Sequence, residues 1–519
     1  MYRFLLLTML LALGACDRAP TIAVAGERLT GMYVEDGKVA AFLGIPFAEP
    51  PLGELRWQGP QPLATTMAQR NVTGFAPACM QSMRILDWYR EVAAAFGGPA
   101  DYYPDLETSE DCLYLNAWTP TLERDAKLPV MVWVHGGSNR SGWSYEPNYH
   151  GHKLAQQGVV VISIAYRQGL FGFISHEDLD RAQPLANFAL WDIVAALQWI
   201  RQNVALLGGD PNRVTMFGES AGAQNILALM FAQPAKGLFH RAILESTADV
   251  GIEHMPTLAE EQARMRAFAQ SVSPLDISLA ALRALPANDL LARYEQDYAD
   301  YYHGPAFDGQ LFLRPIWDSV SHAEFPDIPV IIGTNSDEWY DWLPAELSWD
   351  DVAARAESSW GTAAAKALQL VRHEGEPRQA ANRLLTAHDF LCSSQAFAKR
   401  MTAAGKDAWM YHFTRVREDP GGARMRAFHG AEYAYPFNTH DTYMSTNATD
   451  LELTRAMQSY WVSFAATGNP NSGDTTDWPR FAAPGLPVQE LGDRVMTVTA
   501  PEPGFCALFE EGLAARRNE

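Results

Sequence analysis

The sequence predicts an α/β fold with a large, mostly parallel central sheet flanked by helices, and three features support this. Continuous apolar runs rich in β-branched residues lie at 129–134 and 159–165, as is typical of strands covered on both faces. Apolar residues then recur at helical spacing over 190–204. Strands that alternate with helices favour a doubly wound sheet.

Later segments continue this alternation. A strand at 213–217 runs into a Gly-flanked turn and a helical pattern at 225–231. Two segments, 80–110 and 256–304, are long enough to form loops that build a rim over the sheet. Further strands are expected at 241–244, 328–332 and 408–414.

Length and composition limit the class of protein. The chain has 519 residues, of which 48% are hydrophobic and 19% charged, so it can bury a sizeable core as a globular protein. This composition excludes a disordered or collagen-like chain. The formal charge of −21, with no basic patch, argues against a nucleic-acid partner and favours solubility. No repeat or linker divides the chain, so residues 21–515 are expected to form one domain.

The first residues predict export. One arginine precedes an apolar stretch at 4–13, which is too short to span a bilayer and fits a signal peptide. Residues 1–16 end in Leu13-Gly14-Ala15-Cys16, which resembles a bacterial lipobox, so Cys16 is the expected lipidation site. We expect a periplasmic lipoprotein that touches a membrane only through this anchor. Cleavage after 23–25 would instead give a secreted soluble protein.

Four cysteines remain after Cys16. An even number in an exported chain predicts two disulfides, and three pairings are possible. No CxxC motif or Cys/His cluster has zinc spacing, so no metal is expected. The four are Cys79, Cys112, Cys392 and Cys506.

A nucleophile is indicated by Gly218-Glu219-Ser220-Ala221-Gly222, a G-x-S-x-G motif between a strand and a helix. Glycines allow the sharp turn that raises the Ser220 hydroxyl above the carboxyl ends of the strands. Ala221 opens the helix, so its N–H is free to face a developing oxyanion. The strand–turn–helix context favours this interpretation over an ordinary Gly-rich turn.

A serine hydroxyl needs a base and an orienting acid, which follow it in the order Ser, Asp or Glu, His in α/β-hydrolases. Asp337 and Glu338 follow the strand at 328–332, and His429 follows the strand at 408–414. The residues alone leave both acids open, with His440 as a weaker alternative base. The remaining later histidines are assigned to a strand or to helical stretches: His412, His373 and His388.

The other half of an oxyanion hole is expected before the serine. His135-Gly136-Gly137-Ser138 directly follows the strand that ends at Val134. Glycines there let the backbone approach a substrate carbonyl closely. A simple turn is the alternative, which the serine motif downstream makes less attractive.

These motifs together resemble the type B carboxylesterases, a family of α/β-hydrolases that includes bacterial p-nitrobenzyl esterases and cholinesterases. The resemblance runs from about residue 29 to 513. It rests on ordered motifs in addition to the serine turn: Gly44–Ala48, Pro50–Gly53, Leu55–Trp57, Ser109–Asn116, Tyr166-Arg167, Phe171–Phe173, Gly208–Pro211, Tyr460-Trp461 and Thr467–Pro470.

The resemblance implies a role for each site residue. Ser220 would be the nucleophile, Glu338 rather than Asp337 the acid, and His429 the base. No cofactor is implied. The N–H groups of Gly137, Ser138 and Ala221 would form the oxyanion hole. Disulfides would join Cys79 to Cys112 and Cys392 to Cys506, and Arg56 would pair with Glu110.

Three departures from the family pattern bear on the site. Ser138 replaces a third glycine, and Thr247 stands where glycine is usual. The place of the choline-binding Trp of cholinesterases falls near Tyr102, with Trp88 out of register, which argues against a choline ester.

The expected activity is hydrolysis of small carboxylic esters through an acyl-enzyme. One alternative is an esterase specialised for a single natural ester, such as a polycarboxylate mycotoxin ester or a phenolic ester. Another is a cholinesterase-like binding module without catalysis, which the complete set of three residues disfavours. Six aromatic residues are candidates for the pocket lining or for ordinary core: Trp88, Tyr102, Tyr103, Trp143, Trp339 and Trp342.

Overall fold

The computed structural model describes residues 19–64, 68–99, 101–247, 255–298 and 301–516. In this part of the chain an 11-stranded sheet has the order β16-β15-β14-β13-β12-β11-β9-β10-β8-β4-β3. Its strands are β3 (Met32–Val34), β4 (Val39–Pro46), β8 (Tyr114–Thr119), β9 (Leu128–Val134), β10 (Val160–Ile164), β11 (Gly209–Glu219), β12 (Arg241–Glu245), β13 (Val330–Asn335), β14 (Ala408–Phe413), β15 (Pro487–Leu491) and β16 (Val495–Thr499).

The middle of the sheet is parallel and its edges are antiparallel. From β10 through β9, β11, β12, β13 and β14 to β15, each neighbouring pair is parallel. The pairs β8–β10, β4–β8, β3–β4 and β15–β16 are antiparallel. The predicted mostly parallel α/β sheet, an α/β-hydrolase architecture, is confirmed.

Both faces of the sheet are covered by helices, which explains the continuous apolar runs in the sequence. Val130, Val132 and Val134 of β9 pack on the face covered by α4 and α5. The alternate residues Met131 and Trp133 pack with α2 and α16 on the other face. Because strand side chains alternate between the two faces, a strand buried on both needs apolar residues throughout.

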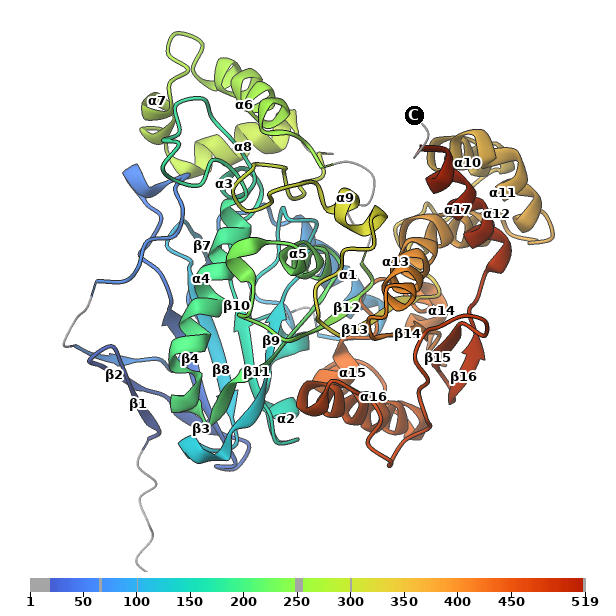
Figure 1. Cartoon of the computed structure of the whole chain (residues 1–519), viewed down its shortest axis with the longest axis horizontal. Coiled ribbons are helices and arrows are strands. Elements are labelled where there is room, and N and C mark those ends of the chain that lie inside the picture. The colour runs from blue at the N-terminus through green and yellow to red at the C-terminus, as the bar shows by residue number, and fades with distance from the viewer. Residues whose placement is uncertain (1–18, 65–67, 100, 248–254, 299–300, 517–519) are drawn as a thin grey trace, which may run out of the picture.

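The segments expected to be rim loops contain helices. Segment 80–110 contains α1, and segment 256–304 contains α6, α7 and α8. Figure 1 shows α6 to α8 grouped beyond one end of the sheet strands, with α10 to α12 and α17 in a second group. The helices are α1 (Arg84–Ala95), α2 (His152–Ala155), α3 (Gly169–Gly172), α4 (Phe188–Asn203), α5 (Ala221–Met230), α6 (Leu258–Val272), α7 (Leu279–Arg283), α8 (Ala287–Asp297), α9 (Ile316–Ser321), α10 (Trp349–Trp360), α11 (Ala364–Val371), α12 (Pro377–Thr386), α13 (Cys392–Ala403), α14 (Pro420–Met425), α15 (Ala434–Phe437), α16 (Ala448–Thr467) and α17 (Pro503–Arg516).

Two small sheets lie outside the large one. The first pairs β1 (Thr21–Val24) with β2 (Glu27–Thr30) and β5 (Gln69–Asn71), and the second pairs β6 (Ala78–Cys79) with β7 (Thr108–Ser109). Among the helices of the described ranges, none is both long and apolar enough to cross a bilayer. Cys16, the expected lipidation site, lies outside the described residues.

Covalent and ionic links hold distant segments together. Disulfide bonds join Cys79 to Cys112 and Cys392 to Cys506, the pairs that the family resemblance implies. Arg56 and Glu110 form a bidentate ion pair, with Nε–Oε1 at 2.6 Å and Nη2–Oε2 at 2.7 Å. Disulfides form in oxidising compartments, so both bonds are consistent with an exported protein.

Candidate active site

Ser220 sits on a sharp turn between β11 and α5. Its φ of +55° is a backbone conformation that non-glycine residues rarely adopt. A Cβ added at Gly218 or Gly222 would lie 2.4 or 2.1 Å from the carbonyl oxygen of Val134. Both glycines are therefore required by the close approach of the turn to β9, as the sequence predicts.

The three expected oxyanion donors lie in the two loops that meet at this turn. Gly137 and Ser138 have φ values of +104° and +57°, so the loop after β9 turns sharply here. In the described part of the chain, the N–H groups of Gly137, Ser138 and Ala221 have no hydrogen-bond acceptor. The positive φ of Ser138 is a left-handed conformation that a glycine, the usual residue at this place in the family, would adopt without strain.

A pair of buried amides, which the sequence analysis did not predict, joins the two loops. Asn139 follows Ser138, and Asn225 lies on α5, one turn after Ser220. Asn225 Nδ2 donates to Asn139 Oδ1 at 2.7 Å, and Asn139 Nδ2 donates to Asn225 Oδ1 at 3.3 Å. Asn139 Nδ2 also donates to the carbonyl of His303 at 2.9 Å. Both side chains are fully buried, so the pair fixes the oxyanion loop against the serine helix.

Glu338 and His429 are brought together from two different strand ends. His429 Nδ1 lies 2.6 Å from Glu338 Oε2, and the N–H of Asn335 donates to Glu338 Oε1 at 2.7 Å. Asp337 points elsewhere, since its Oδ1 accepts from Arg426 Nε at 2.7 Å. Of the two acids that the residues alone left as candidates, Glu338 therefore contacts His429 and Asp337 does not.

The other histidines considered from the sequence lie apart from this pair. His440 is buried and contacts the hydroxyl groups of Thr446 and Thr454 at 3.1 and 2.6 Å. His412 lies within β14, as expected, and His388 lies in a helical segment before α13. His373 was expected in a helix but lies in the turn after α11, where the chain has left the helix.

His429 does not hydrogen-bond to Ser220 in this structure. Its Nε2 lies 3.0 Å from Glu219 Oε1, and the Ser220 hydroxyl has no hydrogen-bond partner among the described residues. Burial alone would lower the pKa of His429, but the carboxylates of Glu219 and Glu338 outweigh it and raise that pKa well above its usual value. The imidazole is thus held between two carboxylates, in a form that favours its protonated state.

A cluster of buried carboxyl groups surrounds the serine turn. Burial raises the pKa of Glu146 and of Glu432 to about 8, and it also raises the pKa of Glu219. Glu432 Oε1 accepts from the Ser246 hydroxyl at 3.0 Å, and Asn335 Nδ2 donates to its Oε2 at 2.5 Å. The charge of Glu219 adds to the effect of burial, because it further disfavours the ionised forms of Glu146 and Glu432.

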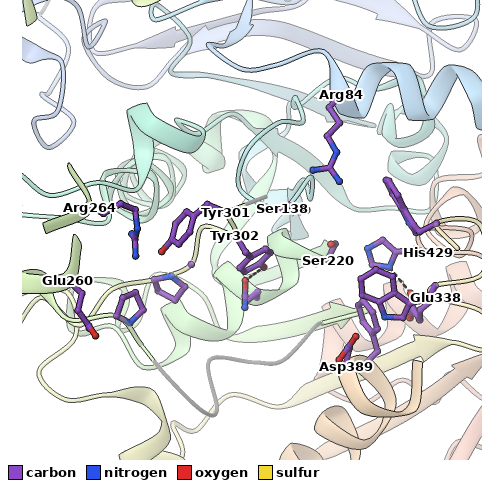
Figure 2. Close-up of a pocket in the computed structure, with 17 residues that line it drawn as sticks. Arg84, Ser138, Ser220, Glu260, Arg264, Tyr301, Tyr302, Glu338, Asp389 and His429 are labelled. Carbon is purple, nitrogen blue, oxygen red and sulfur yellow. Dashed lines mark hydrogen bonds and ion pairs between the residues drawn. The ribbon is translucent and has the colours of Figure 1, made fainter. Parts of the chain in front are cut away.

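A cavity of about 740 Å³ opens beside Ser220 and His429, shown in Figure 2. A smaller one of about 50 Å³ shares Arg84, Ser138, Ser220, Trp342 and His429 with it. The remaining lining residues of the large cavity are Gln224, Pro256, Glu260, Arg264, Tyr301, Tyr302, Gly304, Pro305, Glu338, Trp339, Asp389 and Phe390.

Three of the six candidate aromatic residues line these cavities. Trp339 and Trp342 line the large one, and Trp342 and Trp88 line the small one. Trp88, which is out of register in sequence with the choline-binding Trp of cholinesterases, reaches the site because α1 brings its side chain there. The other three pack elsewhere, within or against the core cluster on one face of the sheet: Tyr102, Tyr103 and Trp143.

In the described ranges, no three His, Cys, Asp or Glu side chains cluster in a way that could bind a metal ion. The charged side chains that line the large cavity are His429, three acids and two arginines, and most of them pair with residues beside the cavity, as Arg264 does with Glu261. The site offers a hydroxyl, an imidazole–carboxylate pair and unoccupied N–H donors, which are the groups that acyl transfer needs.

Known proteins share both this sequence and this fold. Residues 18–500 match the carboxylesterase family. The chain is 35% identical over 467 residues to the fumonisin B1 esterase of Sphingopyxis macrogoltabida, covering 86% of this chain and 82% of that protein. It is 32% identical over 457 residues to the para-nitrobenzyl esterase of Bacillus subtilis (strain 168), covering 84% and 88%. A solved thermophilic PNB esterase superposes with a TM-score of 0.80 at 30% identity, covering 94% of this chain and 99% of that one. The chain therefore belongs to the carboxylesterase family and is a carboxylic ester hydrolase.

Proposed function

We propose that the chain cleaves small carboxylic esters through a covalent acyl-enzyme on Ser220, with His429 as base and Glu338 as acid. The observation that carries this proposal is the 2.6 Å contact between His429 Nδ1 and Glu338 Oε2, at the wall of a cavity that Ser220 also lines. A nucleophile, a base and a group that orients the base are the three parts that such chemistry requires.

The reaction proceeds in two steps. His429 accepts the proton of the Ser220 hydroxyl as its oxygen attacks the ester carbonyl, and the proton then passes to the departing alcohol. Water repeats the sequence and releases the acid. The N–H groups of Gly137, Ser138 and Ala221 hold the oxyanion, and removing one such donor typically costs about 3 kcal/mol of transition-state stabilisation.

The contact between Glu219 and His429 has to break during the first step. Its Oε1 lies 3.0 Å from His429 Nε2, the atom that takes the proton from Ser220. Hydrogen bonds in empty catalytic sites are often misaligned and tighten when substrate binds. We infer that substrate carbonyl binding draws Nε2 from Glu219 toward Ser220.

The proposal is tested by replacing Ser220 and Glu338 separately. Ser220→Ala should lower kcat for a p-nitrophenyl short-chain ester by at least about 1,000-fold, and Glu338→Gln by a similar or smaller factor. Ser459→Ala, in α16 and away from both cavities, is the matched control and should retain activity. Appreciable turnover by Ser220→Ala would refute the assignment.

A narrower function is the alternative. The similarity to a protein named fumonisin B1 esterase favours an esterase specialised for one natural ester, such as a mycotoxin ester, and a phenolic ester is the other candidate. A panel of esters that varies the acid and the alcohol separately distinguishes this from a general esterase. Covalent labelling of Ser220 by a fluorophosphonate would exclude a binding module without catalysis.

The location is also a proposal. We infer that the chain is exported and that a lipid attached to Cys16 anchors it to a bacterial membrane, facing the periplasm. Cleavage before Cys16 leaves β1 intact, whereas cleavage after Ala25 would remove its strand at Thr21–Val24. Metabolic labelling with an alkyne fatty acid should mark the wild type and not Cys16→Ser, and a released, unlabelled wild type would indicate a secreted protein.

A further inference from the structure

Arg84 differs from every other charged side chain that lines the large cavity. Glu260 accepts from Thr257, Arg264 donates to Glu261 at 2.5 Å, and Asp389 contacts His388 at 2.7 Å. Glu338 is engaged by His429, as described above. The Arg84 guanidinium has no hydrogen bond or ion pair to any residue that the structure describes. It is exposed and lines both cavities.

An aromatic stack fixes the position of this guanidinium. Arg84 lies over the ring of Trp342, with its Cζ 5.9 Å from the ring centroid. Trp342 stacks on Trp88 with centroids 5.2 Å apart and an interplanar angle of 12°. Trp88 Nε1 in turn donates to Asp341 Oδ2 at 2.8 Å. A cation held against an aromatic face keeps its N–H donors free for a ligand.

The side chain is directed at the reacting atoms. Figure 2 shows Arg84 extending from the start of α1 with its guanidinium toward Ser138 and Ser220. The two cavities share Arg84, Ser138, Ser220 and His429, so the guanidinium borders the space on each side of the ester that Ser220 would attack.

We propose that Arg84 binds a free carboxylate carried by the substrate, so that the preferred substrates are esters with a second, anionic group. This inference rests on the proposed function of Ser220. Guanidinium groups match carboxylates through paired hydrogen bonds. A cationic substrate is disfavoured, because the protein's own arginine already lies on the Trp342 face.

The overall charge does not itself favour an anionic substrate, so such selectivity requires a local cation. At a formal charge of −21 the protein repels anions at long range. An unpaired arginine beside the serine is therefore needed for an anionic ester to be favoured over a neutral one. Salt should weaken the preference, because the guanidinium is exposed to solvent.

The experiment compares charged and neutral esters of equal shape. Monoethyl adipate and its neutral amide, ethyl adipamate, place the group on the acid side. The pair 4-acetoxybenzoate and 4-acetoxybenzamide places it on the alcohol side. For each pair the ratio of kcat/KM, charged over neutral, is measured at low salt in the wild type and in Arg84→Gln, Arg84→Lys and Arg28→Gln.

The wild type should prefer the charged member of at least one pair by roughly five- to tenfold. Arg84→Gln should bring that ratio to about one or below, and Arg84→Lys should retain part of it. Arg28→Gln removes the same charge from an exposed residue of β2 that lines neither cavity, and should keep the wild-type ratio. The pair that responds identifies the side of the ester that carries the anion.

The failures are distinguishable. A ratio that is at or below one in the wild type, or that is unchanged in Arg84→Gln, overturns the carboxylate site while ester hydrolysis stands. A wild type that hydrolyses none of the four esters counts against the proposed function. Calorimetric titration of monoethyl adipate and 4-acetoxybenzoate into Ser220→Ala, with and without Arg84→Gln, then measures the site alone, and equal affinities in the two variants overturn it.

Discussion

The frame around Ser220 and the outer wall of the cavity are built in different ways. In the frame, the turn between β11 and α5 and the loop at 135–139 lie so close that backbone atoms limit each other. In the wall, Tyr302 and Trp342 are 44% and 38% exposed. The frame therefore tolerates almost no change in side-chain volume, whereas the wall can change and alter which esters enter.

The first prediction breaks the frame and has the largest expected effect. In Gly222→Ala the new Cβ would lie 2.1 Å from the Val134 carbonyl oxygen and 2.6 Å from that of His135. Because backbone and not a flexible side chain is in the way, we expect kcat/KM to fall at least about 100-fold and stability to fall by about 3 kcal/mol or more. Thermal unfolding and ester hydrolysis measure the two effects.

Gly74→Ala is the control for this substitution. Gly74 is exposed, and a Cβ added there meets no atom within 4 Å. Stability and activity should stay close to wild type. If Gly222→Ala behaved like Gly74→Ala, the close approach of α5 to β9 would not be what holds the serine in place.

The second prediction concerns Glu146, one of the buried acids that surround the frame. Burial raises the pKa of Glu146 to about 8 in the folded protein, above its usual value in an unfolded chain. Between these two values the folded state keeps a proton that the unfolded state releases, so stability falls as pH rises. Glu146→Gln removes this loss, and its stability relative to wild type should rise by roughly 2–4 kcal/mol from pH 5 to pH 8.

Denaturant unfolding at the two pH values measures this change. Glu123→Gln replaces an exposed glutamate on the chain segment before β9 and should show no such trend. Parallel pH profiles for wild type and Glu146→Gln would mean that Glu146 is ionised in the folded protein.

The frame is also the part that the sequence predicts well. The serine turn, the loop after β9 and most strand positions follow from local rules, because glycine spacing and apolar periodicity describe contacts between near neighbours in the fold. Asp337 and Glu338 show the limit of such rules. The two adjacent carboxylates are told apart by contacts with residues that the fold brings from a distance. Glu338 contacts His429, whereas Asp337 contacts Arg426.

For the same reason the sequence predicts the wall only as a set of candidate aromatic residues, three of which line the cavities. Trp88 and Arg84 lie on α1, and nothing in their local sequence indicates that this helix begins beside the cavity that Ser220 lines. The segment was expected to be a loop, and the sequence left Trp88 open as a lining residue or ordinary core. The position of α1 is set by its packing in the core that also holds α16 and the strand residues of that sheet face, which is long-range information.

The third prediction concerns the contact between the base, His429, and Glu219 of the frame. Glu219 is one of two carboxylates that raise the pKa of His429, and a base acts only when it is unprotonated. In Glu219→Gln that pKa should fall, so the acid limb of the kcat/KM–pH profile should move to lower pH. Below the wild-type midpoint, activity relative to its own plateau should rise by roughly three- to tenfold.

Glu260→Gln serves as the control, because Glu260 lines the same cavity and pairs with Thr257 rather than with His429. Its acid limb should coincide with that of the wild type. An acid limb that stays in place in Glu219→Gln would show that the carboxylate at 3.0 Å does not govern the base in solution.

The smallest effect is expected in the wall itself. Trp342→Leu shortens a half-exposed side chain, so stability should change by no more than about 0.5 kcal/mol. The same change removes the aromatic face under Arg84, and the preference for charged esters should fall by about two- to threefold. Trp349→Leu is closely matched, at 39% against 38% exposed, but Trp349 lies at the start of α10 and lines neither active-site cavity. It should leave both quantities unchanged. A loss of stability in Trp342→Leu comparable with that of Gly222→Ala would mean that the wall is part of the frame, whereas altered selectivity at constant stability is what two separately built regions require.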